Sequence, residues 1–224
     1  MTRTIMIIGA SRGIGLGLAA EFAARGWQVV ATERTRSDAL HALADAGGQV
    51  RIAQADVTDP ASIAALAAAQ APGSLDAVLV NAGIGDRRNV DEASDEDIAH
   101  IMLANTTGPV RAARALLPAL RDGGTLAFTT SLMGSIADSS GGADLYRMSK
   151  AAQNMLARGL FVTEAQGRAI AVLSLHPGWV KTDMGGGNAP LTVEDSARGM
   201  ADVLTASQPV AHRFLDYQGR ELPW

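Results

Sequence analysis

Tyr146 and Lys150 are a pair of residues whose types and spacing could move a proton. They stand four positions apart in the stretch YRMSK, so on a helix both side chains would share one face. A free phenol has a pKa of about 10 and is a poor base near neutral pH, but an adjacent ammonium favours the phenolate and lowers that pKa. The pair could therefore serve as a general acid or base. By itself, the spacing is more typical of a surface pair or of a contact between subunits.

A second group of residues could hold a phosphate. Gly9, Gly13 and Gly15 lie in the stretch GASRGIG, between a short apolar run and an alanine-rich segment. Glycines at a turn from strand to helix let the backbone approach a ligand closely, and the amide groups and dipole at the helix start favour a pyrophosphate. We therefore predict a dinucleotide site at this turn, formed by Gly9, Ser11, Arg12, Gly13, Ile14 and Gly15.

The elements that must position these residues follow an alternating pattern. Short apolar runs rich in isoleucine and valine lie at 4–9, 27–32, 50–56, 75–83, 124–131 and 169–178. Runs of this kind suit strands buried on both faces of a parallel sheet. The longer segments between them have helical features, such as closure on Gly26 in one and a start at Asp59 and Pro60 in another. The alternation predicts an α/β fold with a Rossmann-type, doubly wound parallel sheet in three αβα layers.

Composition limits the possible classes of function. The 224 residues contain no low-complexity linker and no repeat, so we expect one domain over 1–224. A formal net charge of -4 leaves no broad basic surface for nucleic acid. The absence of cysteine excludes disulfides and thiolate metal sites, and the four histidines do not have the spacing of metal ligands. The apolar runs are too short for a membrane span or a signal peptide, and we expect a cytoplasmic protein without a metal.

Four motifs, in this order, resemble the short-chain dehydrogenase/reductase family. They are the glycine turn at 9–15, NAG at 81–83, Tyr146 with Lys150, and PGWVKTDM at 177–184, and together they span nearly the whole chain. The stretches GSIADSSGG, GGGNAPLT and FLDYQGRELPW are similar to the C-factor-like branch of that family. The resemblance implies an NAD(P)-dependent carbonyl reductase or alcohol dehydrogenase, which transfers hydride between a nicotinamide and a carbonyl or secondary alcohol.

The resemblance also implies a proton relay with four members. Tyr146 would exchange the proton, and Lys150 would lower the pKa of the phenol and bond the nicotinamide ribose. Ser131 would bond the substrate oxygen, but its separation from Tyr146 is longer than is usual in the family, which leaves Ser135 as a competing candidate. Asn105, in LANTTGPV, would hold a water of the relay, although an asparagine there could also be a cap or a kink.

Further contacts to the cofactor are implied at the ends of the third, fourth and sixth runs. The residues expected to border the adenine, its ribose and the nicotinamide are Asp56, Val57, Asn81, Ala82, Gly83, Pro177, Gly178, Val180 and Thr182. Thr182 would contact the carboxamide. Asp56 could instead be an ordinary turn residue, and we expect His176 to be structural.

The choice between NADP and NAD depends on the end of the second run. An acidic side chain at that place bonds the ribose 2′-hydroxyl of NAD, whereas a basic one holds the 2′-phosphate of NADP. The stretch ATERT places Glu33 at the acidic position and Arg34 directly after it, and Arg12 lies in the glycine turn. We expect NADP, because two guanidinium groups suit phosphate recognition. If the arginines only neutralise Glu33 at the surface, the cofactor is NAD.

The surroundings of the site lead to three more expectations. A short glycine-rich stretch, 185–190, precedes the next helix, so we expect a small, open, mobile cover and loose selectivity for small or aromatic carbonyl compounds. The helices containing 107–121 and 146–165 have more apolar positions than one sheet face needs, which predicts a homodimer, unless they are fully buried within a monomer. The alternative functions are a nucleotide-binding signalling or regulatory protein of the same fold and an α/β scaffold that binds no nucleotide.

Overall fold

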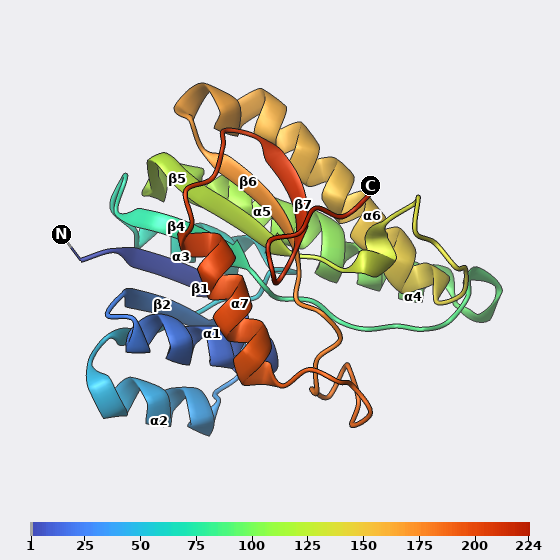
Figure 1. Ribbon diagram of the computed structural model, residues 1–224, viewed down its shortest axis with the longest axis horizontal. Helices are drawn as coiled ribbons and strands as arrows, with labels where there is room; N and C mark the ends of the chain where they lie inside the picture. Colours follow the sequence, from blue (N-terminus) through green and yellow to red (C-terminus); the bar gives the residue numbers. More distant parts are fainter. Residues whose placement is uncertain (1) are drawn as a thin grey trace.

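A seven-stranded parallel sheet forms the middle layer of the molecule (Figure 1). The computed structural model describes residues 2–224. The strands lie in the order β3-β2-β1-β4-β5-β6-β7, and each neighbouring pair runs parallel. Their bounds are β1 Thr4–Ile8, β2 Gln28–Glu33, β3 Val50–Gln54, β4 Leu75–Val80, β5 Leu120–Thr129, β6 Ala171–His176 and β7 His212–Asp216. The doubly wound α/β fold expected from the sequence is confirmed.

Helices cover both faces of this sheet (Figure 1). The bounds are α1 Gly13–Ala24, α2 Asp38–Gly47, α3 Pro60–Ala68, α4 Asp95–Met102, α5 Gly108–Leu116, α6 Asp144–Leu160 and α7 Val193–Thr205. Side chains of α1, α2 and α7 form one apolar layer with the sheet, and side chains of α3, α5 and α6 form the other. A π-helical turn, Leu103–Thr107, joins α4 to α5.

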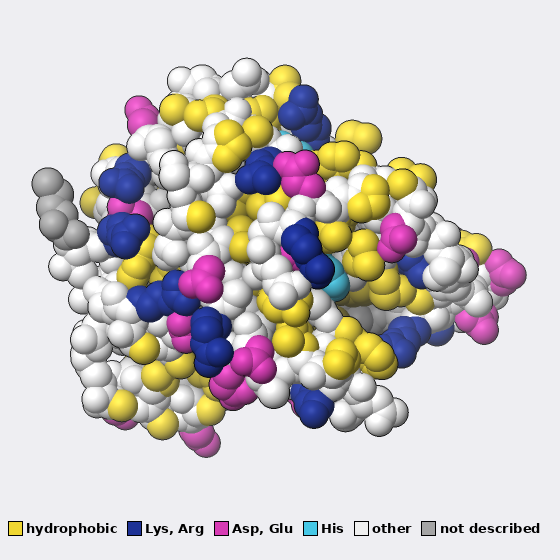
Figure 2. Space-filling view, viewed as in Figure 1, with side chains coloured by type: hydrophobic (Ala, Val, Ile, Leu, Met, Phe, Trp, Pro, Cys, Tyr) yellow, Lys and Arg dark blue, Asp and Glu magenta, His cyan; other side chains and the backbone are white. Residues whose placement is uncertain are grey.

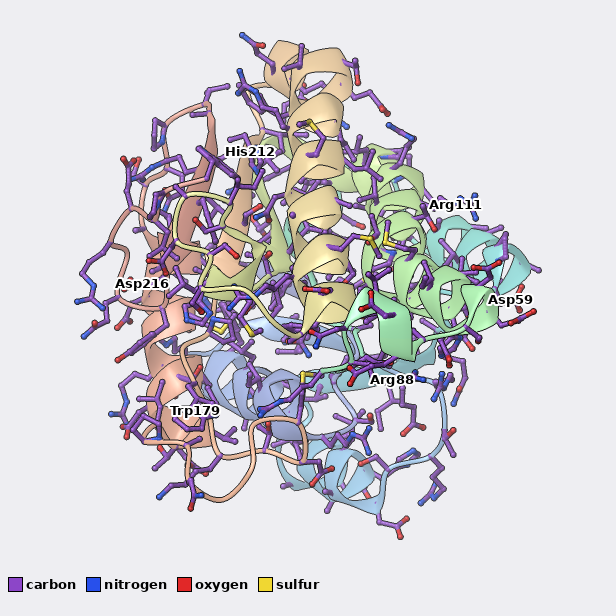
Figure 3. The ribbon with its side chains drawn as sticks, turned by 90° about the vertical axis from the view of Figure 1, so that its right-hand side faces the viewer. Asp59, Arg88, Arg111, Trp179, His212 and Asp216 are labelled. Atoms are coloured by element: carbon purple, nitrogen blue, oxygen red, sulfur yellow. The ribbon has the colours of Figure 1, made fainter. Side chains whose placement is uncertain are left out.

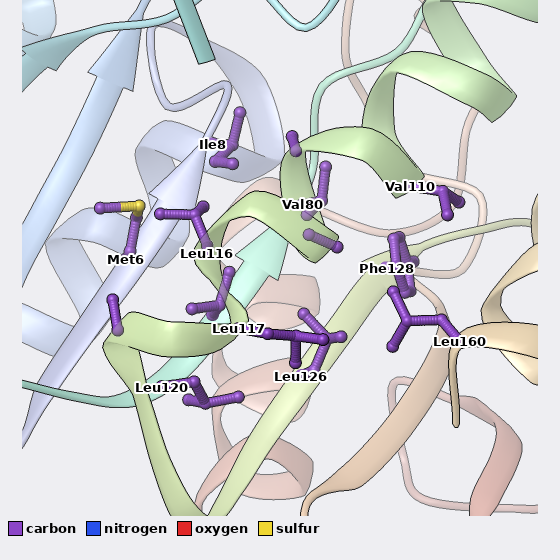
Figure 4. Packing of buried hydrophobic residues seen from close by; sticks show 14 of the residues in the cluster. Met6, Ile8, Val80, Val110, Leu116, Leu117, Leu120, Leu126, Phe128 and Leu160 are labelled. Atoms are coloured by element: carbon purple, nitrogen blue, oxygen red, sulfur yellow. The ribbon is translucent and has the colours of Figure 1, made fainter. Parts of the chain in front are cut away.

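The alternation of side chains along β1 explains why the strand is apolar throughout. Met6 and Ile8 belong to the layer on the α5 side, whereas Ile5 and Ile7 belong to the layer on the α1 side. Figure 4 shows part of the first of these layers, to which Met6, Ile8, Leu116 of α5 and the fully buried Phe128 belong. Burial on both faces fixes the register of the central strand, because a slip by one residue would exchange the two layers.

Two helix ends have the chemistry expected from the sequence. Asp59 Oδ1 accepts a hydrogen bond from the backbone N–H of Ala61 at 2.9 Å, and Pro60 opens α3. Gly26 has a φ of +76° directly after the end of α1, and its N–H bonds the carbonyl of Ala23 at 2.9 Å.

The seventh strand was not anticipated. β7 reads HRFLD and therefore has no continuous apolar run. It lies at the edge of the sheet and pairs with β6, where His212 Nε2 and Ser174 Oγ are 3.0 Å apart. Trp224 covers its outer side, with ring centroids 4.7 Å from His212 and 5.2 Å from Phe214. The strand depends on these distant partners rather than on a local apolar pattern.

Charges of both signs share the surface. On the face seen in Figure 2, lysine and arginine side chains are interspersed with aspartate and glutamate. Within residues 2–224, no helix is long and apolar enough to cross a membrane.

Candidate active site

A cleft of about 550 Å³ lies at the carboxyl ends of the strands. It is lined by the segments that follow β1, β2, β3, β4, β5 and β6 and by side chains of α6. The order of the sheet reverses between β1 and β4, because the chain adds β2 and β3 on one side of β1 and β4 to β7 on the other. Such a reversal opens a crevice outside the strand ends, and ligands of open α/β sheets bind there.

The glycine turn brings the end of β1 against the end of β4. Gly9 has a φ of +87°, and a Cβ at this position would lie 2.8 Å from the Cα of Ala82. A Cβ on Gly15 would overlap the carbonyl oxygen of Gly9. Asn81 closes the junction, because its Nδ2 donates to that carbonyl at 2.8 Å and its Oδ1 accepts from Thr129 Oγ1 at 2.9 Å. Side chains at these glycines would push the end of β4 and the start of α1 away from the end of β1, and their absence lets the three segments pack closely at the cleft.

Glu33 does not line the cleft. It is 2% exposed, its Oε2 accepts from the N–H of Ser37 at 2.7 Å, and its Oε1 lies 3.0 Å from His41 Nε2. Burial raises the pKa of Glu33, but the hydrogen bonds with His41 and Ser37 outweigh it and hold this pKa below its usual range. The carboxylate is therefore occupied inside the protein, which corrects the placement of Glu33 among the cofactor contacts.

Arg12 and Arg34 do line the cleft. Arg12 forms an ion pair with Asp183 at 3.5 Å, and both side chains are more than four-fifths exposed, so this pair is weak. With Glu33 turned away, two guanidinium groups remain in the lining of the cleft, and that of Arg34 is close enough to Asp56 to lower the pKa of this carboxyl. This donor set fits a phosphate on the adenosine ribose.

Lys150 lines the cleft and is 3% exposed. Its Nζ donates to the carbonyl of Thr129 at 2.9 Å and to Gln153 Oε1 at 3.2 Å, and it lies 5.8 Å from the centre of the Tyr146 ring. Burial lowers the pKa of Lys150 to about 8. Burial also raises the pKa of Tyr146, and a hydrogen bond with the Ser131 side chain opposes that rise. The phenol, the ammonium and a serine hydroxyl thus meet at one place.

The two candidate serines have different surroundings. Ser131 ends the β5 segment beside Tyr146 and accepts from the N–H of Met133 at 3.1 Å. Ser135 is 2% exposed, and its Oγ accepts from the N–H of Asp138 at 3.0 Å. Ser135 therefore holds the loop that follows it, whereas Ser131 is the serine next to the phenol.

Asn105 occupies the π-helical turn and is completely buried. Its Oδ1 accepts from the N–H of Ile84 at 2.7 Å, and its Nδ2 donates to the carbonyl of Ile84 at 2.9 Å and to Ser149 Oγ at 3.0 Å. A Cβ on Gly83 would lie 3.1 Å from Asn105 Oδ1 and 3.6 Å from Lys150 Nζ. The side chain of Asn105 thus fixes the segment after β4 against α6, directly beside the ammonium.

A model of the short chain dehydrogenase family matches residues 3–190. This chain belongs to the short-chain dehydrogenase family. The C-signal protein of Myxococcus xanthus is 43% identical over 157 residues, which cover 68% of this chain and 94% of that protein. A solved structure from Burkholderia multivorans with bound NADP is 39% identical, with a TM-score of 0.93. A carbonyl reductase from Pseudomonas aeruginosa PAO1 in complex with NADP is 40% identical, with a TM-score of 0.89, and both comparisons cover all of both chains.

These matches confirm the family and the branch expected from the sequence, and the chain is an oxidoreductase of the short-chain dehydrogenase family. Most of the predicted contacts line its cleft. The predicted residues outside the lining are Asn105, Ser131, Gly15, Glu33, Gly178 and Val180. Gly178 has a φ of +83° and packs against Leu191 and Tyr217, so its role in the structure is to turn the chain after β6.

Sequence reasoning missed several residues that line the cleft of this short-chain dehydrogenase. They are Ala55, Thr58, Ile84, Ala104, Thr129, Thr130, Lys181, Asp183, Met184 and Val193. Thr58 could have been found from Asp56, because the two form an aspartate turn in which Asp56 Oδ1 accepts from the N–H of Thr58 at 2.8 Å and from its Oγ1 at 2.7 Å. Asp56 is therefore both a turn residue and part of the lining.

The cover of the cleft is a loop without a helix between 181 and 191. Leu191 pairs with Val180 where the loop closes, and Trp179 Nε1 donates to the carbonyl of Gly185 at 2.8 Å. Figure 3 shows Trp179 beside this loop, which follows β6. Met184 reaches the opposite side of the cleft, because a Cβ on Gly85 would lie 3.0 Å from its Cγ. The short cover expected from the sequence is present.

Residues 2–224 contain no group of three or more histidine, aspartate or glutamate side chains that could hold a metal ion.

Proposed function

We propose that this member of the short-chain dehydrogenase family is an NADP-dependent carbonyl reductase or alcohol dehydrogenase, which uses Tyr146, Lys150, Ser131 and Asn105 as its proton relay. The observation that carries the proposal is the meeting of Tyr146, Lys150 and Ser131 at one end of the cleft. A protein that only binds a nucleotide needs no buried ammonium beside a phenol. Bound NADPH would supply the hydride for reduction of a carbonyl carbon and would leave as NADP, with its nicotinamide bordered by Thr182 and Pro177.

The chain's own residues would hold the cofactor by charge and by backbone contact. The backbone of the glycine turn would receive the pyrophosphate, and Arg12 and Arg34 would hold the 2′-phosphate. Glu33 does not oppose this assignment, since its carboxylate is saturated by Ser37 and His41. The NADP in two solved relatives supports the same cofactor.

In the direction of reduction, Tyr146 would donate its phenolic proton to the substrate oxygen. Ser131 would hold that oxygen in place, and the ammonium of Lys150 would stabilise the phenolate that remains. Lys150 has three N–H groups, two of which are bonded to Thr129 and Gln153 within the protein. The third is free to bond a ribose hydroxyl in the cleft. Asn105 would keep the segment after β4 in position beside them.

Replacement of the phenolic hydroxyl tests this function. We expect Tyr146→Phe to lower kcat/KM for carbonyl reduction with NADPH by about 10²- to 10⁴-fold, because the acid is lost, while the NADPH dissociation constant stays unchanged. Steady-state kinetics on a panel of small and aromatic carbonyl compounds, with titration of nicotinamide fluorescence, gives both numbers. Tyr217→Phe is the matched control, since the second tyrosine of the chain packs beside Gly178 outside the cleft lining.

Two outcomes would contradict the proposal. Full activity in Tyr146→Phe would show that Tyr146 does not donate the proton. Tight NADPH binding by the unchanged protein, with no turnover on the panel, would favour a nucleotide-binding signalling protein, a function that the name of the C-signal relative also suggests.

We also propose that α6 forms part of a homodimer interface. Met148 and Met155 of α6 and Val162 of the π-helical turn Phe161–Ala165 that continues it are spaced seven residues apart, and they are 39%, 70% and 53% exposed. Such a stripe is more apolar than water-facing helices usually are. Light scattering after size exclusion should give the mass of a dimer, and Met155→Glu should give the mass of a monomer. A monomer for the unchanged protein would refute the interface.

For the whole chain we propose one domain and a cytoplasmic location. Strands from residue 4 to residue 216 share one sheet, which supports a single unit over 1–224. The loop of 181–191, which contacts the rest of the cleft through few side chains, supports broad selectivity for small or aromatic carbonyl compounds.

A further inference from the structure

Gln153 is a buried glutamine three residues after Lys150 on α6. It has no exposed surface, and its Oε1 accepts a hydrogen bond from Lys150 Nζ at 3.2 Å. Its Nε2 has no partner among the described residues. A buried amide with one unpaired donor is costly compared with an apolar side chain of the same size. Any function of this side chain must therefore depend on its oxygen, which bonds Lys150, and not on its nitrogen.

Among residues 2–224, no carboxylate contributes to the shifted pKa of the Lys150 ammonium. From the end of β5 it meets the carbonyl of Thr129, from the π-helical turn it faces the amide of Asn105 across Gly83, and from its own helix it faces the ring of Tyr146. Tyr146 is the ionisable side chain in this set. Burial alone accounts for the lowered pKa of Lys150, which is about 8. Neutral dipoles thus stabilise the charged form of Lys150, and each of them contributes a large part of that stabilisation.

We propose that Gln153 is a positioning residue that keeps Lys150 charged and aimed into the cleft. The inference rests on the function proposed above for Lys150. An amide oxygen that accepts from an ammonium stabilises the charged form and leaves its third N–H pointing to the ligand. Through this contact Gln153 controls the upper pH limit at which Lys150 can stabilise the phenolate of Tyr146.

The lysine content of the chain allows a direct test without catalysis. Lysine occurs at 150 and 181, and Lys181 lies exposed on the cover loop. Protein labelled with ¹³C at the lysine ε-carbon should therefore give two resolved titration curves by NMR, with Lys181→Arg to assign them. Loss of a hydrogen bond to a charged group is expected to lower the pKa of Lys150 by about one unit in Gln153→Leu. Gln153→Glu should raise it, because a carboxylate replaces the amide.

A matched control separates this effect from a loss of packing. Asn154 is the next residue, is 4% exposed and also has an unpartnered amide nitrogen, but its Oδ1 accepts from Thr130 Oγ1 instead of from the ammonium. Asn154→Leu should leave the Lys150 titration unchanged. Gln153→Asn, which withdraws the oxygen with little loss of volume, should lower the pKa as Gln153→Leu does. Equal Lys150 titrations in the unchanged protein and in both of these Gln153 variants would overturn the proposal.

The pH dependence of kcat/KM connects the contact to the chemistry. The charged form of Lys150 is lost as pH rises through its pKa, so the basic limb should move down by about one pH unit in Gln153→Leu and up in Gln153→Glu. If the unchanged protein reduces no carbonyl, the proposed function fails while the NMR titration still decides the role of Gln153. A shifted titration with an unshifted basic limb would show that Gln153 does not act through Lys150 in catalysis.

Discussion

Glu33 and Arg34 are neighbours in the sequence, yet their side chains serve different parts of the molecule. Successive side chains at the end of β2 point to opposite sides, so Glu33 enters the region of Ser37 and His41 while Arg34 faces the cleft. The stretch ATERT alone leaves this choice open, because the partners of Glu33 come from the start of α2. The preference between NADP and NAD therefore depends on the direction in which single side chains point.

Arg34 should discriminate between the two nucleotides. We expect Arg34→Ala to weaken NADPH binding by about 10- to 100-fold, because a guanidinium bond to a phosphate is lost, and to leave NADH binding unchanged. Fluorescence titration with both nucleotides measures this. Arg36→Ala is the matched control, since Arg36 bonds Asp38 and His41 at the surface outside the cleft lining. Equally weakened binding of NADPH and NADH by Arg34→Ala would show that Arg34 does not hold the 2′-phosphate.

At the scale of elements, two glycines in or beside α6 have opposite effects on stability. A Cβ on Gly134 would lie 2.9 Å from the backbone carbon of Lys150, so this glycine lets the turn Leu132–Gly134 pack directly on the helix. Gly159 lies on the exposed side of α6, and a Cβ there would meet no atom within 4 Å. The first glycine is needed for close packing, and the second only weakens its helix.

The stability of the two alanine variants should therefore change in opposite directions. We expect Gly134→Ala to lower the free energy of unfolding by about 1 to 3 kcal/mol, because the turn must move away from Lys150. Gly159→Ala should raise it by about 1 kcal/mol when it is made in the Met155→Glu variant, in which the proposed interface is broken. Urea unfolding followed by tryptophan fluorescence measures both. A lower stability for Gly159→Ala would mean that this side of α6 is covered in solution.

Local patterns were enough to predict most elements, and distant contacts explain the remainder. The runs of β1 to β6 and the cap at Asp59 depend on neighbours in the sequence, and they are where the residues predict them. β7 depends on Ser174 and Trp224, which no local pattern reveals. The position of Ser131 was uncertain because the segment 136–143 is longer than expected. The structure turns this segment away at Gly141, Gly142 and Ala143, all with positive φ, before α6 begins.

At the scale of the whole molecule, the buried His212 and the half-buried His176 oppose folding in acid. Burial lowers the pKa of His176 and of His212 to about 4, from an ordinary value of 6.5. Asp216 partly opposes this at His176, and Arg158 adds to it at His212. Both side chains are neutral in the folded protein near pH 5, whereas the unfolded chain binds protons as pH falls through about 6.5. Stability should therefore fall between pH 6.5 and pH 4.

Unfolding in urea at pH 7.5 and at pH 5.0 measures this loss. We expect His212 to contribute up to about 2 kcal/mol of this loss of stability, because at pH 5.0 its side chain is protonated in the unfolded chain and neutral in the folded protein. His212→Gln, which keeps a hydrogen-bonding group for Ser174, should reduce the difference between the two pH values. The carboxylates with shifted pKa values titrate below this range, so they do not mask the effect. The same difference in the variant would contradict the role of His212.

The order of strands has a consequence for how the chain is made. β1 pairs with β2 soon after both are synthesised, but its other neighbour is β4, and the bond from the N–H of Thr4 to Asp76 Oδ2 joins positions 72 residues apart. Until residues 75–80 leave the ribosome, β1 presents an open edge of isoleucine and methionine that other chains can join. Refolding should also be slow, because the centre of the sheet forms only when a long loop closes. The turn after β1, the first strand to be made, is thus completed only when Ala82 at the end of β4 packs against Gly9.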